Sequence, residues 1–401
     1  MRRIFLALLL GLAFCAPLSA QRGVPRRPAL PAAADTNDAS AYLQYGAARL
    51  RTSARDAADA FYWAMQLNPA SAEALYGRYT ALLLTDPARL LRYWEGDRRT
   101  ARSREVMAID SLLFRAMTLD PFLYRKYEHE LFRTAYRTAI RRDVDQVEGG
   151  MSVSENDIQS YLDALVARGG PWLKAQEAYS RSRFAEALTF YDQAMRETRR
   201  KAWLRAERSR IMEHMGQRPQ AIAEMRQAID EMRRTDERDL IFIYESKAIL
   251  EHSVATLHER LGNLDSAQVA YGRALEEDLS FYPAHMRLAM IALSRADTTT
   301  ALAELDLAAQ VANEPYVGYT YGTVLAQAGK LDEAAAQLEK VIAAAPHYAA
   351  PHAMLGLVRD WQGNTAAAVA AYRGFLARAP ANDPRRAQLQ ARVTDLAGGG
   401  Q

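Results

Sequence analysis

The chain has 401 residues, of which 49% are hydrophobic and 25% are charged, and its formal net charge is +3. These are ordinary values for a globular protein and argue against a disordered chain.

The first twenty residues have the pattern of a bacterial signal peptide. Arg2 and Arg3 precede an apolar stretch over residues 4–16, which is too short to span a bilayer comfortably, and small residues follow up to Ala20. We therefore expect cleavage after Ala20 and export, most simply into the periplasm, with secretion as the alternative. The mature chain is expected to have no transmembrane segment.

Cleavage at that point would remove Cys15, the one cysteine of the sequence. The mature protein would then have neither a disulfide nor a thiol nucleophile. A lipoprotein signal is disfavoured, because Phe14 stands where that signal requires a small residue. Residues 21–38, rich in Pro, Ala and Arg, are expected to form a flexible leader.

Beyond the leader, a pattern of small and apolar residues returns about every 34 residues. It is clearest near the C-terminus, where all five offsets equal 34: Gly322, Gly329, Ala334, Leu338 and Pro346, then Gly356, Gly363, Ala368, Tyr372 and Pro380. A fixed period of this size is typical of a solenoid, in which each helical hairpin buries its apolar face only by stacking on its neighbours.

The pattern resembles the tetratricopeptide repeat (TPR) family, whose signature is W-x2-L-G-x2-Y, then A-x3-F, then Pro. The resemblance implies an all-α, right-handed superhelical solenoid of TPR hairpins. It also implies binding to a protein or peptide rather than catalysis. Gly356 and Ala368 are expected where the two helices of a hairpin cross, and Gly329 and Gly363 in the turns between helices.

The repeats divide the chain after the leader into five parts, two of which interrupt the regular spacing. They are 39–121, with TPR-like repeats and an insertion near 86–105; 122–170, an irregular helical segment; 171–235, with two repeats; 236–380, with four repeats; and 381–401, a capping helix and tail.

The irregular segment is expected to begin with a long helix over about 122–147. A break at Gly149 and Gly150 follows, and then a second helix begins near Ser154, capped with the help of Asp157. We interpret this segment as a diverged hairpin. Extra residues over 229–250 should lengthen two adjoining helices or add a turn.

No pattern of catalytic or metal-binding residues is recognisable. The seven histidines form no H-E-x-x-H zinc motif, and the sequence contains neither a G-x-S-x-G nucleophile elbow nor a phosphate-binding glycine loop. The sequence thus predicts no enzyme, no metal site and no cofactor. Nucleic acid is not expected as a partner, since no known reading module is present.

Charge is distributed unevenly along the chain. Residues 236–401 have a net charge of −6, whereas residues 21–235 have a net charge of +7. The basic residues around Arg199 and Arg210 suggest an acidic partner segment or an anionic surface. The alternative is a solvated helix face whose charges are neutralised by acidic neighbours.

The TPR resemblance places the partner on the concave surface, which the first helix of each hairpin lines. Aromatic, Met and Arg side chains supply most of the energy at protein interfaces. In this register the inward positions hold Trp172, Tyr179, Trp203, Arg210, His214, His252, Arg260, Met286, Met290, Tyr316, Tyr319 and Trp361. We predict an exported adaptor or scaffold; the alternative is a carrier of a glycan or small ligand in the same groove.

Overall fold

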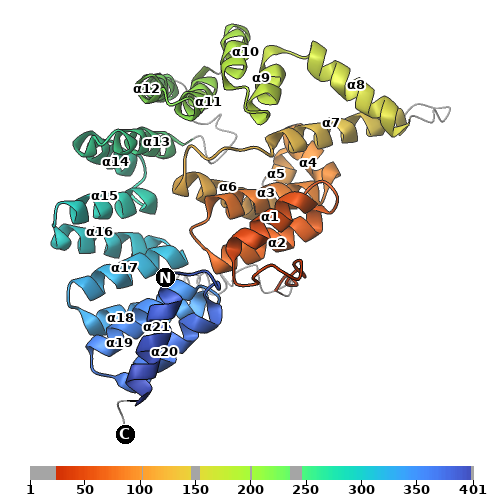
Figure 1. The fold of residues 1–401 in the computed structure, drawn as a ribbon. Helices are drawn as coiled ribbons and strands as arrows, with labels where there is room; N and C mark the ends of the chain where they lie inside the picture. Colours follow the sequence, from red (N-terminus) through yellow and green to blue (C-terminus); the bar gives the residue numbers. More distant parts are fainter. Residues whose placement is uncertain (1–23, 102, 146–153, 199–200, 235–245, 399–401) are drawn as a thin grey trace, which may run out of the picture.

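The computed structural model describes residues 24–398, apart from 102, 146–153, 199–200 and 235–245. The described residues form 21 α-helices and no strand. Most consecutive helices pack as hairpins, and the hairpins stack side by side along a curved path (Figure 1). The expected all-α solenoid is confirmed.

The N-terminal part contains one regular hairpin and one interrupted hairpin. Helices α1 (Ala39–Arg49) and α2 (Ala54–Leu67) form the first. In the second, α3 (Ala72–Leu84) packs against α6 (Arg104–Leu119), although they are not consecutive. Two short helices stand between them, within the insertion noted in the sequence: α4 (Pro87–Trp94) and α5 (Arg98–Ala101).

The irregular segment differs from the sequence-based interpretation at its start. Helix α7 runs over Glu128–Asp145, so it begins at residue 128 and not near 122. Pro121 ends the preceding helix, and the following residues are held outside a helix by side chains from elsewhere in the chain. Helix α7 packs mainly on α4, and less on α8 (Glu155–Arg168), its expected hairpin partner.

The cap of α8 is as expected. Ser154 accepts a hydrogen bond from the backbone of Asp157, and the Asp157 carboxylate accepts one in return, which completes a capping box. The break at Gly149 and Gly150 lies outside the described residues.

Six regular hairpins follow, each from two consecutive helices. They are α9 (Pro171–Ser180) with α10 (Phe184–Glu197), α11 (Lys201–His214) with α12 (Arg218–Arg234), α13 (Lys247–Arg260) with α14 (Leu264–Glu277), α15 (Tyr282–Ser294) with α16 (Thr298–Val311), α17 (Pro315–Gln327) with α18 (Leu331–Ala344), and α19 (Ala349–Trp361) with α20 (Thr365–Arg378). Helix α12, at 17 residues, is longer than the 14 residues of α14. The rest of the expected lengthening, over 235–245, lies outside the described residues.

Helix α21 (Arg385–Gly398) covers the last hairpin. Its Val393 is buried against Ala368 and Tyr372 of α20. Ala368 is fully buried, as are its equivalents in the preceding repeats, Ala334, Ala301 and Ala267. The expected burial of these small residues is confirmed.

In the hairpins α17–α18 and α19–α20 the helices approach closely because one of them has a glycine where the other presents a large side chain. A Cβ atom added to Gly356 would lie 2.4 Å from the Tyr372 ring, and one added to Gly322 would lie 2.9 Å from Leu338. Any larger residue would hold the two backbones apart.

Glycine is also required in the turns between the helices. Gly329 and Gly363 have φ values of 77° and 75°. Ser182 and Ala296 occupy the equivalent turns with φ values of 58° and 59°, a conformation that is costly for residues with a Cβ atom.

The two ends of the described chain lie against each other, so the arc closes on itself (Figure 1). The Asn37 side chain donates to the carbonyl of Ala377 at 3.1 Å, and Trp63 contacts the His347 ring at 4.9 Å. Arg27 in turn lies 4.8 Å from the Trp63 ring. Residues 24–38 therefore have no helix, as expected of a leader, but they are fixed by contacts.

We predict opposite effects for alanine at two glycines. Gly356→Ala should lower the free energy of unfolding by about 1–3 kcal/mol, because the new methyl group overlaps Tyr372. Gly272→Ala, in α14 with no atom within 4 Å of the added Cβ, is the control and should be neutral or stabilise by up to about 1 kcal/mol. Urea unfolding measures both. A Gly356→Ala variant as stable as the parent would contradict this packing.

Candidate functional site

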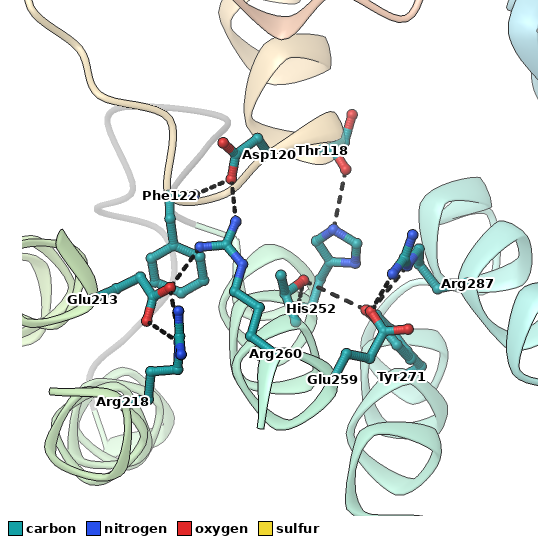
Figure 2. Close-up of polar contacts among 11 residues, drawn as sticks. Thr118, Asp120, Phe122, Glu213, Arg218, His252, Glu259, Arg260, Tyr271 and Arg287 are labelled. Atoms are coloured by element: carbon teal, nitrogen blue, oxygen red, sulfur yellow. Dashed lines mark hydrogen bonds and ion pairs between the residues drawn. The ribbon is translucent and has the colours of Figure 1, made fainter. Parts of the chain in front are cut away.

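Residues 118–127, here called the crossing segment, lie against α9, α11 and α13. Figure 2 shows the contacts of its first residues with α13. The segment starts at the end of α6 and runs to the start of α7. The His252 Nε2–H donates to the carbonyl oxygen of Thr118 at 3.1 Å, and Arg260 pairs with Asp120 at 2.9 Å. Both partners belong to α13, so α13 holds the beginning of the segment.

Phe122 anchors the middle of the crossing segment. Its side chain is buried against Ala221 and Leu257, which come from two neighbouring hairpins. The Arg260 guanidinium lies 5.0 Å from the centre of the ring, within the range of a cation–π contact. One aromatic side chain of the segment therefore bridges α12 and α13.

Tyr124 enters an aromatic cluster between α9, α10 and α11. Its ring lies edge-on to Tyr179, Phe184 and His214, at centroid distances of 5.3, 5.8 and 5.7 Å. Its hydroxyl donates to the carbonyl oxygens of Tyr179 and Ser180 at 3.0 and 2.8 Å. These carbonyls are at the end of α9, where helical partners are missing, so Tyr124 also caps that helix.

Arg125 brings a buried charge into contact with α11. Its guanidinium pairs with Glu207 of α11 and with Glu128, the latter at 3.1 Å, and its backbone N–H donates to the Tyr179 hydroxyl at 3.2 Å. Glu207 also binds Arg210 at 2.6 Å. Arg125, Glu207 and Arg210 are each 2–3% exposed, so these charges neutralise one another away from solvent.

The pKa values of the two acids differ because their partners differ. Burial raises the pKa of Glu207, but the guanidinium groups of Arg125 and Arg210 outweigh burial and hold it below its usual value. Burial dominates at Glu128 and raises its pKa to about 7, although Arg125 opposes the shift. Glu207 is thus the acid of this cluster that stays ionised beside Arg125 and Arg210.

Two further ion-pair groups hold the helices around the crossing segment in register. Glu213 joins Arg260 at 2.8 Å and Arg218 at 3.1 Å, which links α11, α12 and α13. Glu259 accepts from Tyr271 at 2.6 Å and from Arg287 at 2.5 Å, which links α13, α14 and α15 (Figure 2).

The structure brings five of the predicted partner-binding residues into contact with the crossing segment or with a side chain that binds it. They are Tyr179, Arg210, His214, His252 and Arg260. Tyr179, Arg210 and His252 are buried in these contacts. Partner binding by these residues stays a prediction, and in this structure their neighbour is the chain itself.

The other predicted residues lie elsewhere. Trp172 contacts Trp203 and the Phe132 ring of α7, at 5.9 and 4.9 Å. The Tyr316 hydroxyl donates to that of Tyr282 at 3.3 Å. Tyr319 lies edge-on to Tyr348 at 5.5 Å, Met286 is buried, Met290 is 43% exposed and Trp361 is 53% exposed.

The sequence analysis did not identify the residues of the crossing segment as part of this site. Phe122, Tyr124 and Arg125 fall in the region expected to start a long helix, and Asp120 lies at the end of the preceding repeat region. Two signals were available: Pro121 directly after a repeat, and three aromatic residues within the next six positions. Neither signal says which helices the segment meets.

The described ranges contain no group of three or more His, Cys, Asp or Glu residues that could hold a metal ion. No described helix combines the length and the apolar character needed to cross a membrane.

Comparisons with known proteins agree with the helical-repeat architecture at low similarity. No family model and no curated protein matches the sequence. The structure is similar to YrrB, described as a TPR protein with an unusual peptide-binding site, at 17% identity and TM-score 0.39 over 50% of this chain and 97% of that one.

Two other solved structures are similar to a comparable degree. The type IV pilus biogenesis factor PilW matches at 15% identity and TM-score 0.39 over 51% of this chain and 89% of that one. The Cut9–Hcn1 tetramer of APC/C matches at 14% identity and TM-score 0.41 over 88% of this chain and 63% of the other. At these values the overlays add nothing about function, and the fold rests on the hairpins described above.

The buried histidine of the site predicts a pH dependence of stability. Burial and, to a lesser degree, Arg287 lower the pKa of His252 from 6.5 to about 3. Below pH 6.5 His252 therefore binds a proton in the unfolded chain but stays neutral in the folded chain. The free energy of unfolding falls as the pH falls. Between pH 7 and pH 5 this group alone should cost about 2 kcal/mol.

Urea unfolding of the parent and of His252→Gln at both pH values measures this contribution. The variant should lose about 2 kcal/mol less on acidification than the parent does. His258→Gln, which replaces a less buried histidine of the same helix, is the control and should change the difference less. Equal losses in the parent and in His252→Gln would contradict the assignment.

Proposed function

We propose that this protein is a non-enzymatic scaffold or adaptor that binds another protein through its concave surface. One observation supports the proposal: residues 118–127 lie against α9, α11 and α13 through both backbone and side-chain contacts, as a bound polypeptide would. A helical-repeat fold is generally non-catalytic and offers such surfaces along its whole length.

The proposed partner site lies on the later hairpins, because the groove of α9, α11 and α13 is occupied. Met290 of α15 and Trp361 of α19 are large apolar side chains at inward register positions, and they are 43% and 53% exposed. Tyr316 and Tyr319 of α17 stand between them in the stack and are half-buried. Aromatic and Met side chains are the types that dominate binding energy at interfaces.

The second candidate function is a carrier for a glycan or small ligand. The aromatic side chains that favour a peptide also provide stacking surfaces for sugar rings, so residue types do not separate the two. Protein binding is the first proposal, because a helical-repeat fold offers extended binding surfaces along its length.

The test compares partner binding by a variant of the proposed anchor residues with binding by a control variant. Mature protein is used to isolate partners from an envelope extract and is tested in parallel on a glycan array. With the isolated partner, Met290→Ala combined with Trp361→Ala should weaken binding by about 2 kcal/mol or more, because both side chains would be interface anchors. Leu279→Ala is the control, since that side chain is 81% exposed and lies between helices α14 and α15.

Unchanged affinity in the double variant would place the partner outside these hairpins. Binding to the array, with no protein retained, would favour the carrier function.

We also propose that the protein is exported and acts in the periplasm or outside the cell. The support is the Arg2 and Arg3 start, the apolar stretch over 4–16 and the small residues before Gln21. Expression of the whole sequence in a Gram-negative host should yield a periplasmic protein that begins at Gln21, as measured by intact mass. Retention of Met1, or a lipid on Cys15, would contradict this.

A further inference from the structure

The crossing segment contacts the groove as a bound peptide would. Between Asp120 and Tyr127 it has no helical or strand structure, and its anchors reach different helices. Asp120 pairs with Arg260 of α13, and Phe122 is buried against residues of α12 and α13. Tyr124 contacts α9, and Arg125 pairs with Glu207 of α11. The specificity thus comes from four side chains spread along a backbone that is neither helix nor strand.

We infer that residues 118–127 are an internal ligand, which occupies a peptide-binding groove of α9, α11 and α13 until an external peptide displaces it. The external peptide would be a segment with the same chemistry: a carboxylate, an aromatic residue two positions later, and a second aromatic residue two positions after that, followed by Arg. This inference deepens the proposed function and rests on it only for the claim that the ligand is a protein.

The groove has a distinct site for each of these groups. Arg260 faces the carboxylate at one end, and Glu207 faces the guanidinium at the other, so the order of charges sets the direction of the peptide. Between them lie the apolar contacts of Ala221 and Leu257 and the aromatic cluster of Tyr179, Phe184 and His214. A peptide of reversed polarity would place like charges together and be rejected.

The crossing segment can leave this groove without unfolding the helices on either side. Helix α6 packs mainly on α3 and α7 mainly on α4, so both helices stay anchored when their smaller contacts with α13 and α9 open together with the segment. The segment is also tethered at both ends, which gives it a high effective concentration of the order of millimolar. A free peptide therefore binds the parent protein weakly, and weakening the internal ligand exposes the groove.

The experiment measures binding of a fluorescent synthetic peptide of residues 118–127 by anisotropy. The parent protein should bind it weakly, and a Phe122→Ala, Tyr124→Ala variant should bind it at least about tenfold more tightly, because the groove is then open in a larger fraction of molecules. In that background Arg260→Ala should weaken binding again, and a peptide carrying the same two alanines should not bind.

Folding of each variant is checked by circular dichroism and thermal unfolding. Should the double variant not fold, Tyr124→Ala alone, which removes a half-buried ring, keeps the test and should give a smaller gain of the same sign. A folded variant whose groove binds the peptide no better than the parent overturns the inference and makes the crossing segment a permanent part of the core.

The outcome is separable from that of the scaffold test. If the peptide does not bind, the proposal of a partner that binds at Met290 and Trp361 is unaffected. Peptide binding to the opened groove, without any partner on the later hairpins, would support this inference and move the proposed binding site to α9, α11 and α13.

Discussion

The buried pair between Arg125 and Glu207 is the interaction on which the position of the crossing segment depends. A buried guanidinium is tolerated only where acceptors surround it, and Glu207, Glu128 and the Tyr179 hydroxyl lie within contact of Arg125. Removing Arg125 would leave Glu207 with Arg210 alone, and removing Glu207 would leave Arg125 with Glu128 as its acidic partner. The pair therefore holds the crossing segment against α11.

Closure of the arc changes what the groove can bind. In an open solenoid, the first helices of successive hairpins present a continuous concave surface. Here the crossing segment covers part of that surface, and Arg115 of α6 pairs with Glu314 beside α17 at 2.5 Å, which brings the N-terminal hairpins against the later ones. The inner surface is thereby divided into an occupied part and a part where Met290 and Trp361 remain exposed.

Acidic neighbours neutralise much of the basic cluster of α11. Arg205 and Arg208 of α11 both bind Glu224, and Arg205 also binds Glu231, so much of this basic cluster is neutralised by acids of α12. Arg210 is buried on Glu207. This favours the interpretation of a helix face neutralised by its neighbours, and it leaves less charge there to attract an acidic partner.

The sequence by itself determined the hairpins, because their contacts are local and recur with a fixed period. Gly356 against Tyr372, the turn at Gly363 and the buried Ala368 each involve residues within about one repeat of each other, so the pattern predicts them. Only the tertiary structure decided what fills the groove. The contacts of Thr118 with His252 and of Arg125 with Glu207 join residues 134 and 82 positions apart, with no period to mark them. Residue type identified Tyr179, Arg210 and Arg260 as binding groups, whereas the identity of their neighbour depended on how the chain folds back.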